Sequence, residues 1–197
     1  MVTVKGTGRK RGWVIAAVAA AAIVLAAGLA LFKPWLLFVD VKVDEALPTV
    51  AVSPERTAPS PPAASEVPSP SATPKQNTPA GPVQLASGSL ISHEHATTGT
   101  VRIIRQPDGT RVLTLENLDT SNGPDVHVWL SAADVVEGTA GWFTAGSAAY
   151  LDLGLIKGNQ GNQVYAIPAD ADLSKYKSVD LWCVQFAVSF GAAQLKF

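Results

Sequence analysis

The feature that most constrains this chain is an uncharged apolar run from Gly12 to Phe32. As a helix rising 1.5 Å per residue, a run of this length spans about 31 Å, which is the hydrocarbon thickness of one bilayer. Backbone polar groups in lipid have no partners outside their own segment, so such a run must be helical. The sequence therefore predicts a transmembrane helix over residues 12–32.

Basic residues are concentrated on one side of this run. Lys5 and the Arg9-Lys10-Arg11 cluster precede it, whereas only Lys33 follows closely. The positive-inside rule then predicts a cytoplasmic basic tail over residues 1–11 and a single-pass protein of the cell membrane whose C-terminal domain is extracytoplasmic. The competing interpretation is a cleaved signal peptide with Gly28-Leu29-Ala30 as the cleavage site. The run is longer than a typical signal core, which favours an uncleaved anchor.

A juxtamembrane segment and a linker follow the run. In residues 33–47, valines alternate with charged residues from Val39 to Val43, which indicates a short strand or an interfacial segment. Residues 48–82 hold ten of the chain's fourteen prolines, with Ser, Ala and Thr between them. Such a composition cannot form a core, so we expect an extended, disordered stalk.

Residues 83–197 have the pattern of an all-β domain. Short alternating runs are separated by turn signals such as Gln106-Pro107-Asp108-Gly109. Several short strands in about 110 residues predict an antiparallel β-sandwich or a closed barrel. This region carries seven Lys/Arg and eleven Asp/Glu. A nucleic-acid partner is therefore not expected, because such binding needs a basic face.

Cys183 is the only cysteine in the chain, so no internal disulfide can form. It lies in an alternating run that we expect to continue as a strand through Phe186, with Trp182 on one face and Cys183 on the other. A lone sulfur in a strand is either a small buried hydrophobe or a reactive atom. Without a Cys-x-x-Cys or Cys-x-x-Cys-His motif, thioredoxin-type exchange and covalent c-type haem attachment are excluded.

The three histidines, His93, His95 and His127, are the other candidate ligands. With Asp125 or Cys183 they would supply donors of the kind that copper or zinc accepts. A His-x-His pair has low specificity, however, so the favoured interpretation is three unrelated histidines and no metal site is predicted. His127 is the most interesting of them because it lies in a Gly-Pro-Asp-x-His block.

Several blocks together carry a family resemblance. They are Asn122-Gly123-Pro124-Asp125-Val126-His127-Val128-Trp129-Leu130, Leu153-Gly154, Lys157-Gly158-Asn159-Gln160-Gly161-Asn162-Gln163-Val164-Tyr165, Ile167-Pro168, Tyr176, Ser178-Val179, Leu181-Trp182-Cys183, Phe186, Phe190-Gly191 and Ala193-Gln194-Leu195. In order and spacing they make residues 87–197 resemble the DM-thirteen (DM13) domain. The resemblance implies a β-sandwich and a non-cytoplasmic redox role that runs through a shared cysteine, which is Cys183 here. It also implies that this cysteine acts as a bare thiol or as a ligand of a prosthetic group such as haem.

The resulting hypothesis is a membrane-anchored domain with a redox or electron-transfer role centred on Cys183, and with His127 as a further cofactor ligand. Its partners would be the membrane, through residues 12–32, and an unidentified redox protein. No hydrolase motif is present, so an electron carrier is favoured over a turnover enzyme. The alternative is a non-catalytic binding or adhesion module in which Cys183 is structural. The environment of the sulfur distinguishes the two.

Overall fold

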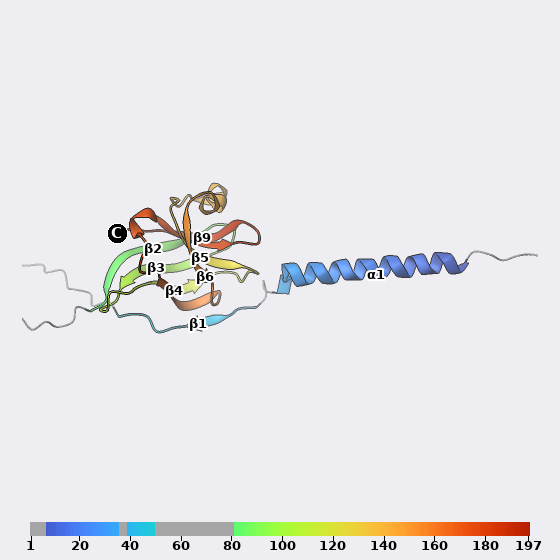
Figure 1. Cartoon of the computed structure of the whole chain (residues 1–197), viewed down its shortest axis with the longest axis horizontal. Coiled ribbons are helices and arrows are strands. Elements are labelled where there is room, and N and C mark those ends of the chain that lie inside the picture. The colour runs from blue at the N-terminus through green and yellow to red at the C-terminus, as the bar shows by residue number, and fades with distance from the viewer. Residues whose placement is uncertain (1–6, 36–38, 50–80) are drawn as a thin grey trace, which may run out of the picture.

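A computed structural model of the chain describes residues 7–35, 39–49 and 81–197 (Figure 1). The helix and the strands are α1 (Thr7–Phe32), β1 (Lys42–Asp44), β2 (Val83–Ser92), β3 (Thr98–Arg105), β4 (Arg111–Asp119), β5 (Val126–Ser131), β6 (Tyr150–Leu155), β7 (Gln160–Ile167), β8 (Ser178–Cys183) and β9 (Val188–Gln194). Three short 3₁₀ turns lie between strands: η2 (Gly138–Phe143), η3 (Ala145–Ser147) and η4 (Leu173–Lys175). Nearly all of the predicted linker, residues 50–80, lies outside the described residues.

Helix α1 extends away from the β domain, with its C-terminal end toward it (Figure 1). Its segment Gly12–Phe32 is long and apolar enough to cross a membrane. The large apolar side chains of this segment are exposed, as expected of a helix whose apolar surface is matched to lipid rather than to a protein core. The predicted helix is therefore confirmed, and a single candidate membrane-spanning segment near the N-terminus fits a single-pass membrane protein.

The strands of the described residues form one nine-stranded sheet in the order β1-β7-β4-β3-β2-β9-β8-β5-β6. Strand β2 joins its two halves: residues from Val83 to Ser89 pair with β3, whereas Leu90 to Ser92 pair with β9. The sheet curls about this strand, so that side chains from both halves meet in one core. The prediction of an all-β domain is thus confirmed, in the form of a curled sheet that is open between its outer strands β1 and β6.

The core is built by the alternation read from the sequence. On β5, Val126, Val128 and Leu130 point inward, and on β8 Val179, Leu181 and Cys183 do the same. The described core cluster consists of Ala86, Leu90, Val101, Ile103, Leu113, Leu115, Leu118, Val126, Val128, Leu130, Tyr165, Ile167, Val179, Leu181, Cys183, Val188, Phe190, Ala193 and Leu195. Burial of this apolar surface is the main force that closes the two halves of the sheet.

The juxtamembrane segment contributes a strand to this sheet. Strand β1 pairs in parallel with β7, with Val43 opposite Gly161. A Cβ atom on Gly161 would overlap the backbone carbonyl of Val43, so only glycine permits this close approach. Asn159 fixes the pairing further, because its Oδ1 accepts a 2.7 Å hydrogen bond from the backbone N–H of Val41. The glycine-rich loop before β7 is therefore a docking site for the chain that arrives from the membrane.

One strand prediction was wrong. The alternating pattern suggested that the strand continues through Phe186, but β8 ends at Cys183 and residues 184–187 form the turn to β9. Ala187 has a φ of 51° and supplies the left-handed conformation that this turn requires. Cys183 consequently lies at the end of a strand, directly beside an exposed turn.

Candidate functional site

Cys183 is a free cysteine in the core of the domain. It is opposite Val126 on β5 and Val188 on β9, and its exposed fraction is 0%. The β8–β9 turn follows directly, and the side chains of Val184 and Phe186 in that turn are exposed. The sulfur is therefore shielded, although the next residue in the chain belongs to an exposed turn.

The surroundings of Cys183 change the pKa of its thiol in opposite directions. Burial raises the pKa of Cys183, whereas backbone hydrogen bonds from Phe186, Gln185 and Asp125 lower it. A backbone group that lowers a thiol pKa must be an N–H donor, because only a donor stabilises the thiolate. Burial outweighs these donors, so the resting group is a thiol.

The turn after Cys183 also contacts the end of the apolar helix. The Phe186 ring is stacked on the Phe32 ring with 5.9 Å between centroids, and Gln185 Nε2 donates a 3.0 Å hydrogen bond to the carbonyl of Leu31. Phe32 is the last residue of the candidate membrane span. Cys183 therefore lies at the end of the domain that is attached to α1.

His127 lies between two carboxylates. Its Nε2 is 3.1 Å from Asp125 Oδ1, and its Nδ1 is 2.8 Å from Asp152 Oδ2. The second contact is short but poorly directed, so it is an ion pair rather than a hydrogen bond. Partial burial acts to lower the pKa of His127, but the ion pair with Asp152 and the hydrogen bond with Asp125 outweigh it, so this pKa is raised. Both ring nitrogens of His127 therefore face carboxylates, so neither is presented as an open ligand.

The structure does not bring Cys183 and His127 together. Cys183 is paired with Val126 on the core face, whereas His127 is paired with Trp182 on the opposite face of the same sheet. Among the described residues no group of three or more His, Cys, Asp or Glu side chains is arranged to hold a metal ion.

A haem bound through Cys183 is the prosthetic group that the family resemblance implies. Haem ligation needs open space on the sulfur side of the strand, but Cys183 is packed against Val126, Leu181 and Val188 in the core. Four hollows lie elsewhere in the described part of the chain, and Cys183 lines none of these four. Haem therefore does not fit at Cys183 in this arrangement.

His93 belongs to a buried polar chain that the sequence did not reveal. Its Nδ1 is 2.7 Å from Ser189 Oγ, and Ser189 Oγ donates a 2.9 Å hydrogen bond to Asp180 Oδ2. The other ring nitrogen, Nε2, lies 3.1 Å from the carbonyl of Val136. Since a carbonyl only accepts, Nε2 carries a proton whenever this contact is a hydrogen bond. His95 does not belong to this hydrogen-bonded chain of His93, Ser189 and Asp180, and instead pairs with Glu94 at 2.6 Å.

Asp180 is the unusual member of this chain. Its exposed fraction is 2%, and its Oδ1 has no hydrogen-bond partner among the described residues. Burial raises the pKa of Asp180 to about 7, while the hydrogen bond from Ser189 lowers it. The signal in the sequence was an aspartate in the middle of an otherwise apolar strand, but only the register of β8 against β9 shows its partner.

Three aromatic rings form a stack on the same face of the sheet. Trp182 on β8 lies 5.1 Å from Trp129 on β5, and Trp129 lies 3.7 Å from Tyr150 at the start of β6, measured between ring centroids. The interplanar angles are 21° and 5°, so the rings are close to parallel. Trp129 and Trp182, together with Ala145, form a second buried cluster that is separate from the main core.

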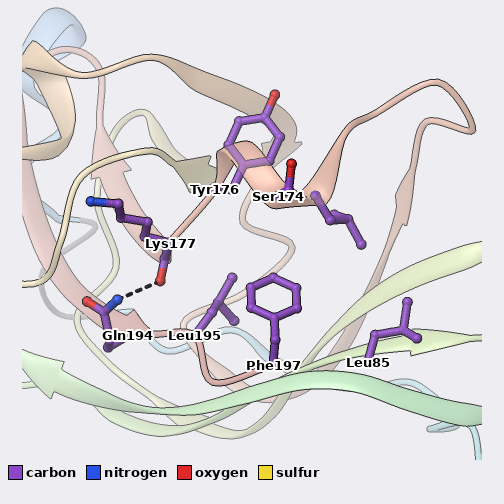
Figure 2. Close-up of a pocket in the computed structure, with 8 residues that line it drawn as sticks. Leu85, Ser174, Tyr176, Lys177, Gln194, Leu195 and Phe197 are labelled. Carbon is purple, nitrogen blue, oxygen red and sulfur yellow. Dashed lines mark hydrogen bonds between the residues drawn. The ribbon is translucent and has the colours of Figure 1, made fainter.

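Two of the four hollows have mainly apolar linings. One has a volume of about 540 Å³ and lies between η4 and the C-terminal residues, lined mainly by Leu85, Tyr176, Leu195 and Phe197 (Figure 2). The other measures about 530 Å³ and is lined by aromatic residues of the domain and by Phe32 at the end of α1. Both volumes are within the range of small-molecule sites, but neither hollow contains a cluster of reacting groups.

The fold and these groups define an all-β domain that follows a helix long and apolar enough to span a membrane. The core face of the sheet carries a shielded thiol, and the opposite face carries a polar and aromatic cluster. The family model described as Electron transfer DM13 matches residues 89–195, which is more than half of the chain and includes Cys183. The chain belongs to this family, and the resemblance read from the sequence is confirmed. No curated protein and no solved structure matches it.

Proposed function

We propose that this protein is a membrane-anchored electron carrier of the extracytoplasmic surface, with Cys183 as its redox group. The observation that carries the proposal is membership of the Electron transfer DM13 family over residues 89–195, from the last part of β2 to the end of the sheet. Helix α1 supports the anchoring, and the basic residues that precede the apolar run support an extracytoplasmic domain.

In this proposal Cys183 gives up one electron to an oxidised one-electron carrier and one proton to a nearby base. The carboxylate of Asp125 is an available acceptor, because it is close enough for its charge to raise the thiol pKa. Re-reduction by a second one-electron carrier returns the electron, and Asp125 returns the proton to the sulfur. The backbone N–H groups around the sulfur support this role, since they stabilise negative charge on it.

A second candidate is a non-catalytic binding module in which Cys183 is structural. The complete burial of the sulfur among apolar side chains favours it, because a buried free cysteine behaves as a small hydrophobe. The two candidates differ in one measurable respect, namely whether electron transfer depends on the sulfur.

The test uses the full chain in lipid nanodiscs, with Cys183→Ala beside the native protein. Electron exchange is measured by stopped-flow with reduced and oxidised ruthenium ammine complexes. Val126→Ala is the matched control, because Val126 is the direct cross-strand partner of Cys183 in the same core. Exchange that is lost in Cys183→Ala and kept in Val126→Ala supports the electron carrier. Equal exchange in all three proteins would reject Cys183 as the centre, and no exchange in any of them favours the binding module.

A further inference from the structure

The stacked rings of Trp182, Trp129 and Tyr150 form a continuous line from the residue before Cys183 to the surface. Trp182 precedes Cys183 in the chain and is 4% exposed, Trp129 is 5% exposed, and Tyr150 is 49% exposed. The stack therefore has two buried members and one open end. Indole and phenol rings are the most easily oxidised side chains besides thiols, and close stacking gives strong contact between their π systems.

The 3₁₀ turn η3 covers the buried end of the stack. A Cβ atom on Gly146, which lies in η3, would overlap the Trp182 ring, so this glycine sits directly against the indole. Ala145 completes the same cluster. The stack is thus shielded from water everywhere except at Tyr150.

A proton acceptor lies beside the central ring. An indole that loses an electron becomes a strong acid at its N–H and needs a base to become a neutral radical. Trp129 Nε1 is buried and has no partner among the described residues, and Asp180 is the direct cross-strand partner of Trp129. Directly opposed residues on one face of an antiparallel pair have Cβ atoms about 5 Å apart. Asp180 Oδ1 is likewise buried without a partner, so donor and acceptor occupy the same dry region.

The hydroxyl of Ser189 keeps Asp180 able to take up a proton. When Asp180 is ionised, Ser189 Oγ donates to it and accepts from His93 Nδ1–H, and a neutral His93 in that tautomer gives up its Nε2–H donation to the Val136 carbonyl. When Asp180 is protonated, the carboxyl can donate to Ser189 and Ser189 can donate to His93. Both arrangements keep the contacts of Ser189 with Asp180 and His93, and only the protonated form of Asp180 also leaves Nε2–H of a neutral His93 free to donate to Val136. The pKa of about 7 places the two forms of Asp180 close in energy near neutral pH.

We propose that the Trp182–Trp129–Tyr150 stack is the route by which single electrons pass between the Cys183 end of β8 and a one-electron carrier that docks at Tyr150, with Asp180 taking the indole proton of Trp129. In the central step one electron leaves Trp129 through Tyr150 to the oxidised carrier, and the Nε1 proton moves to the Asp180 carboxylate. The products are a neutral indolyl radical, a neutral carboxyl and a reduced carrier. An electron from the Cys183 side, together with the proton from Asp180, restores Trp129. This inference rests on the proposed function, because it describes the route to the same centre.

The experiment places a photo-oxidant at the open end of the stack. Ala149 is exposed and precedes Tyr150, so Ala149→Cys can be labelled with a ruthenium polypyridyl while the buried Cys183 is not. After a flash, transient absorption follows radical formation in the full chain in nanodiscs. In the parent protein we expect a neutral tryptophan radical. In Trp129→Phe, which keeps an aromatic ring but cannot be oxidised, the rate of radical formation should be lower by about tenfold or more. Asp180→Asn should shift the signal to the protonated radical cation.

Two controls keep the outcomes distinct. Trp142→Phe alters an indole outside the stack and should leave the radical unchanged, and a label at Ala169→Cys, on the loop after β7, should yield less of it. An equal radical yield in Trp129→Phe and the parent protein would overturn the proposal and leave the stack as packing.

Radical formation does not require Cys183. A normal radical in a Cys183→Ala protein that no longer exchanges electrons supports both proposals, and a normal radical beside unchanged exchange rejects only the role of Cys183.

Discussion

Trp129 on β5 and Asp180 on β8 are direct cross-strand partners, and each buries a polar atom that no described residue satisfies. Buried polar groups without partners destabilise a fold, so their retention side by side points to a role other than packing. Both lie on the face of the sheet opposite Cys183, and Asp180 precedes Cys183 by three residues on β8. The domain therefore has an apolar face with the thiol and a second face with a titratable carboxyl and oxidisable rings.

The buried carboxyl predicts a pH-dependent stability. The pKa of Asp180 is about 7 in the folded protein, against an ordinary value of 3.8, so between these values the folded state holds a proton that the unfolded state has lost. Its contribution is complete below the ordinary value and is lost as the pH rises through about 7. We expect the free energy of unfolding to fall by up to about 1 kcal/mol per pH unit across this window.

Chemical denaturation at several pH values tests this expectation with Asp180→Asn, which cannot titrate. The free energy of unfolding should fall less steeply with pH in Asp180→Asn than in the native protein. In the exposed-site control Asp170→Asn its dependence on pH should be unchanged. His93, whose pKa is lowered by burial, acts in the opposite direction because it resists protonation as the pH falls. Parallel curves for the native protein and Asp180→Asn would mean that Asp180 is ionised in the folded state.

Trp182 should be a major stabilising residue although it lies outside the main core. Its ring is stacked on Trp129 and covered by η3, so Trp182→Ala should lower the free energy of unfolding by about 3–5 kcal/mol. The control is Phe143→Ala, an exposed aromatic that should change stability by less than about 0.5 kcal/mol. Thermal melting monitored by circular dichroism measures both, and an unchanged melting point in Trp182→Ala would contradict the placement of this ring.

Much of the fold follows from local patterns. The uncharged run from Gly12 to Phe32 defined α1, because no other structure satisfies its backbone in lipid. The strands followed from period-two alternation and from turns such as Pro107-Asp108-Gly109. The exception was the β8–β9 turn, which contains no Gly, Pro or Asn, and whose left-handed residue is Ala187. Without a turn signal, the alternation appeared to continue past Cys183.

The candidate site depended on pairings that a single sequence does not contain. Alternation put Trp182 and Cys183 on opposite faces, but it did not show that His127 shares the face of Trp182. The contact between Ser189 and Asp180 depends on the register of β8 with β9, including a shift next to Trp182. Likewise, β1 is more than a hundred residues from its partner β7, so nothing local indicates that they pair.

The parallel β1–β7 pair predicts a strong effect at Gly161. Gly161→Ala places a methyl group against the Val43 carbonyl and strains a backbone with a φ of +96°. Gly154→Ala is a matched control, because Gly154 has a φ of +110° but open space around its Cβ position. We expect about 1–2 kcal/mol of destabilisation in the control from backbone strain alone, and a larger loss in Gly161→Ala. Hydrogen exchange should show loss of protection at β1 only in Gly161→Ala, and equal protection in both variants would place β1 elsewhere.

The shielding of Cys183 predicts slow thiol chemistry that the adjoining turn controls. With an exposed fraction of 0% and a raised pKa, the native thiol should react with a maleimide far more slowly than the same thiol in denaturant. Ala187→Gly relieves the left-handed strain of the turn without altering the core, and it should stabilise the domain by about 0.5–1 kcal/mol and slow labelling further. Phe186→Ala removes the ring that is stacked on Phe32 and should speed labelling. Labelling of full-length protein in nanodiscs, followed by intact mass, measures all three rates. Rates that are equal in the three proteins would show that the thiol is reached by a path other than the turn.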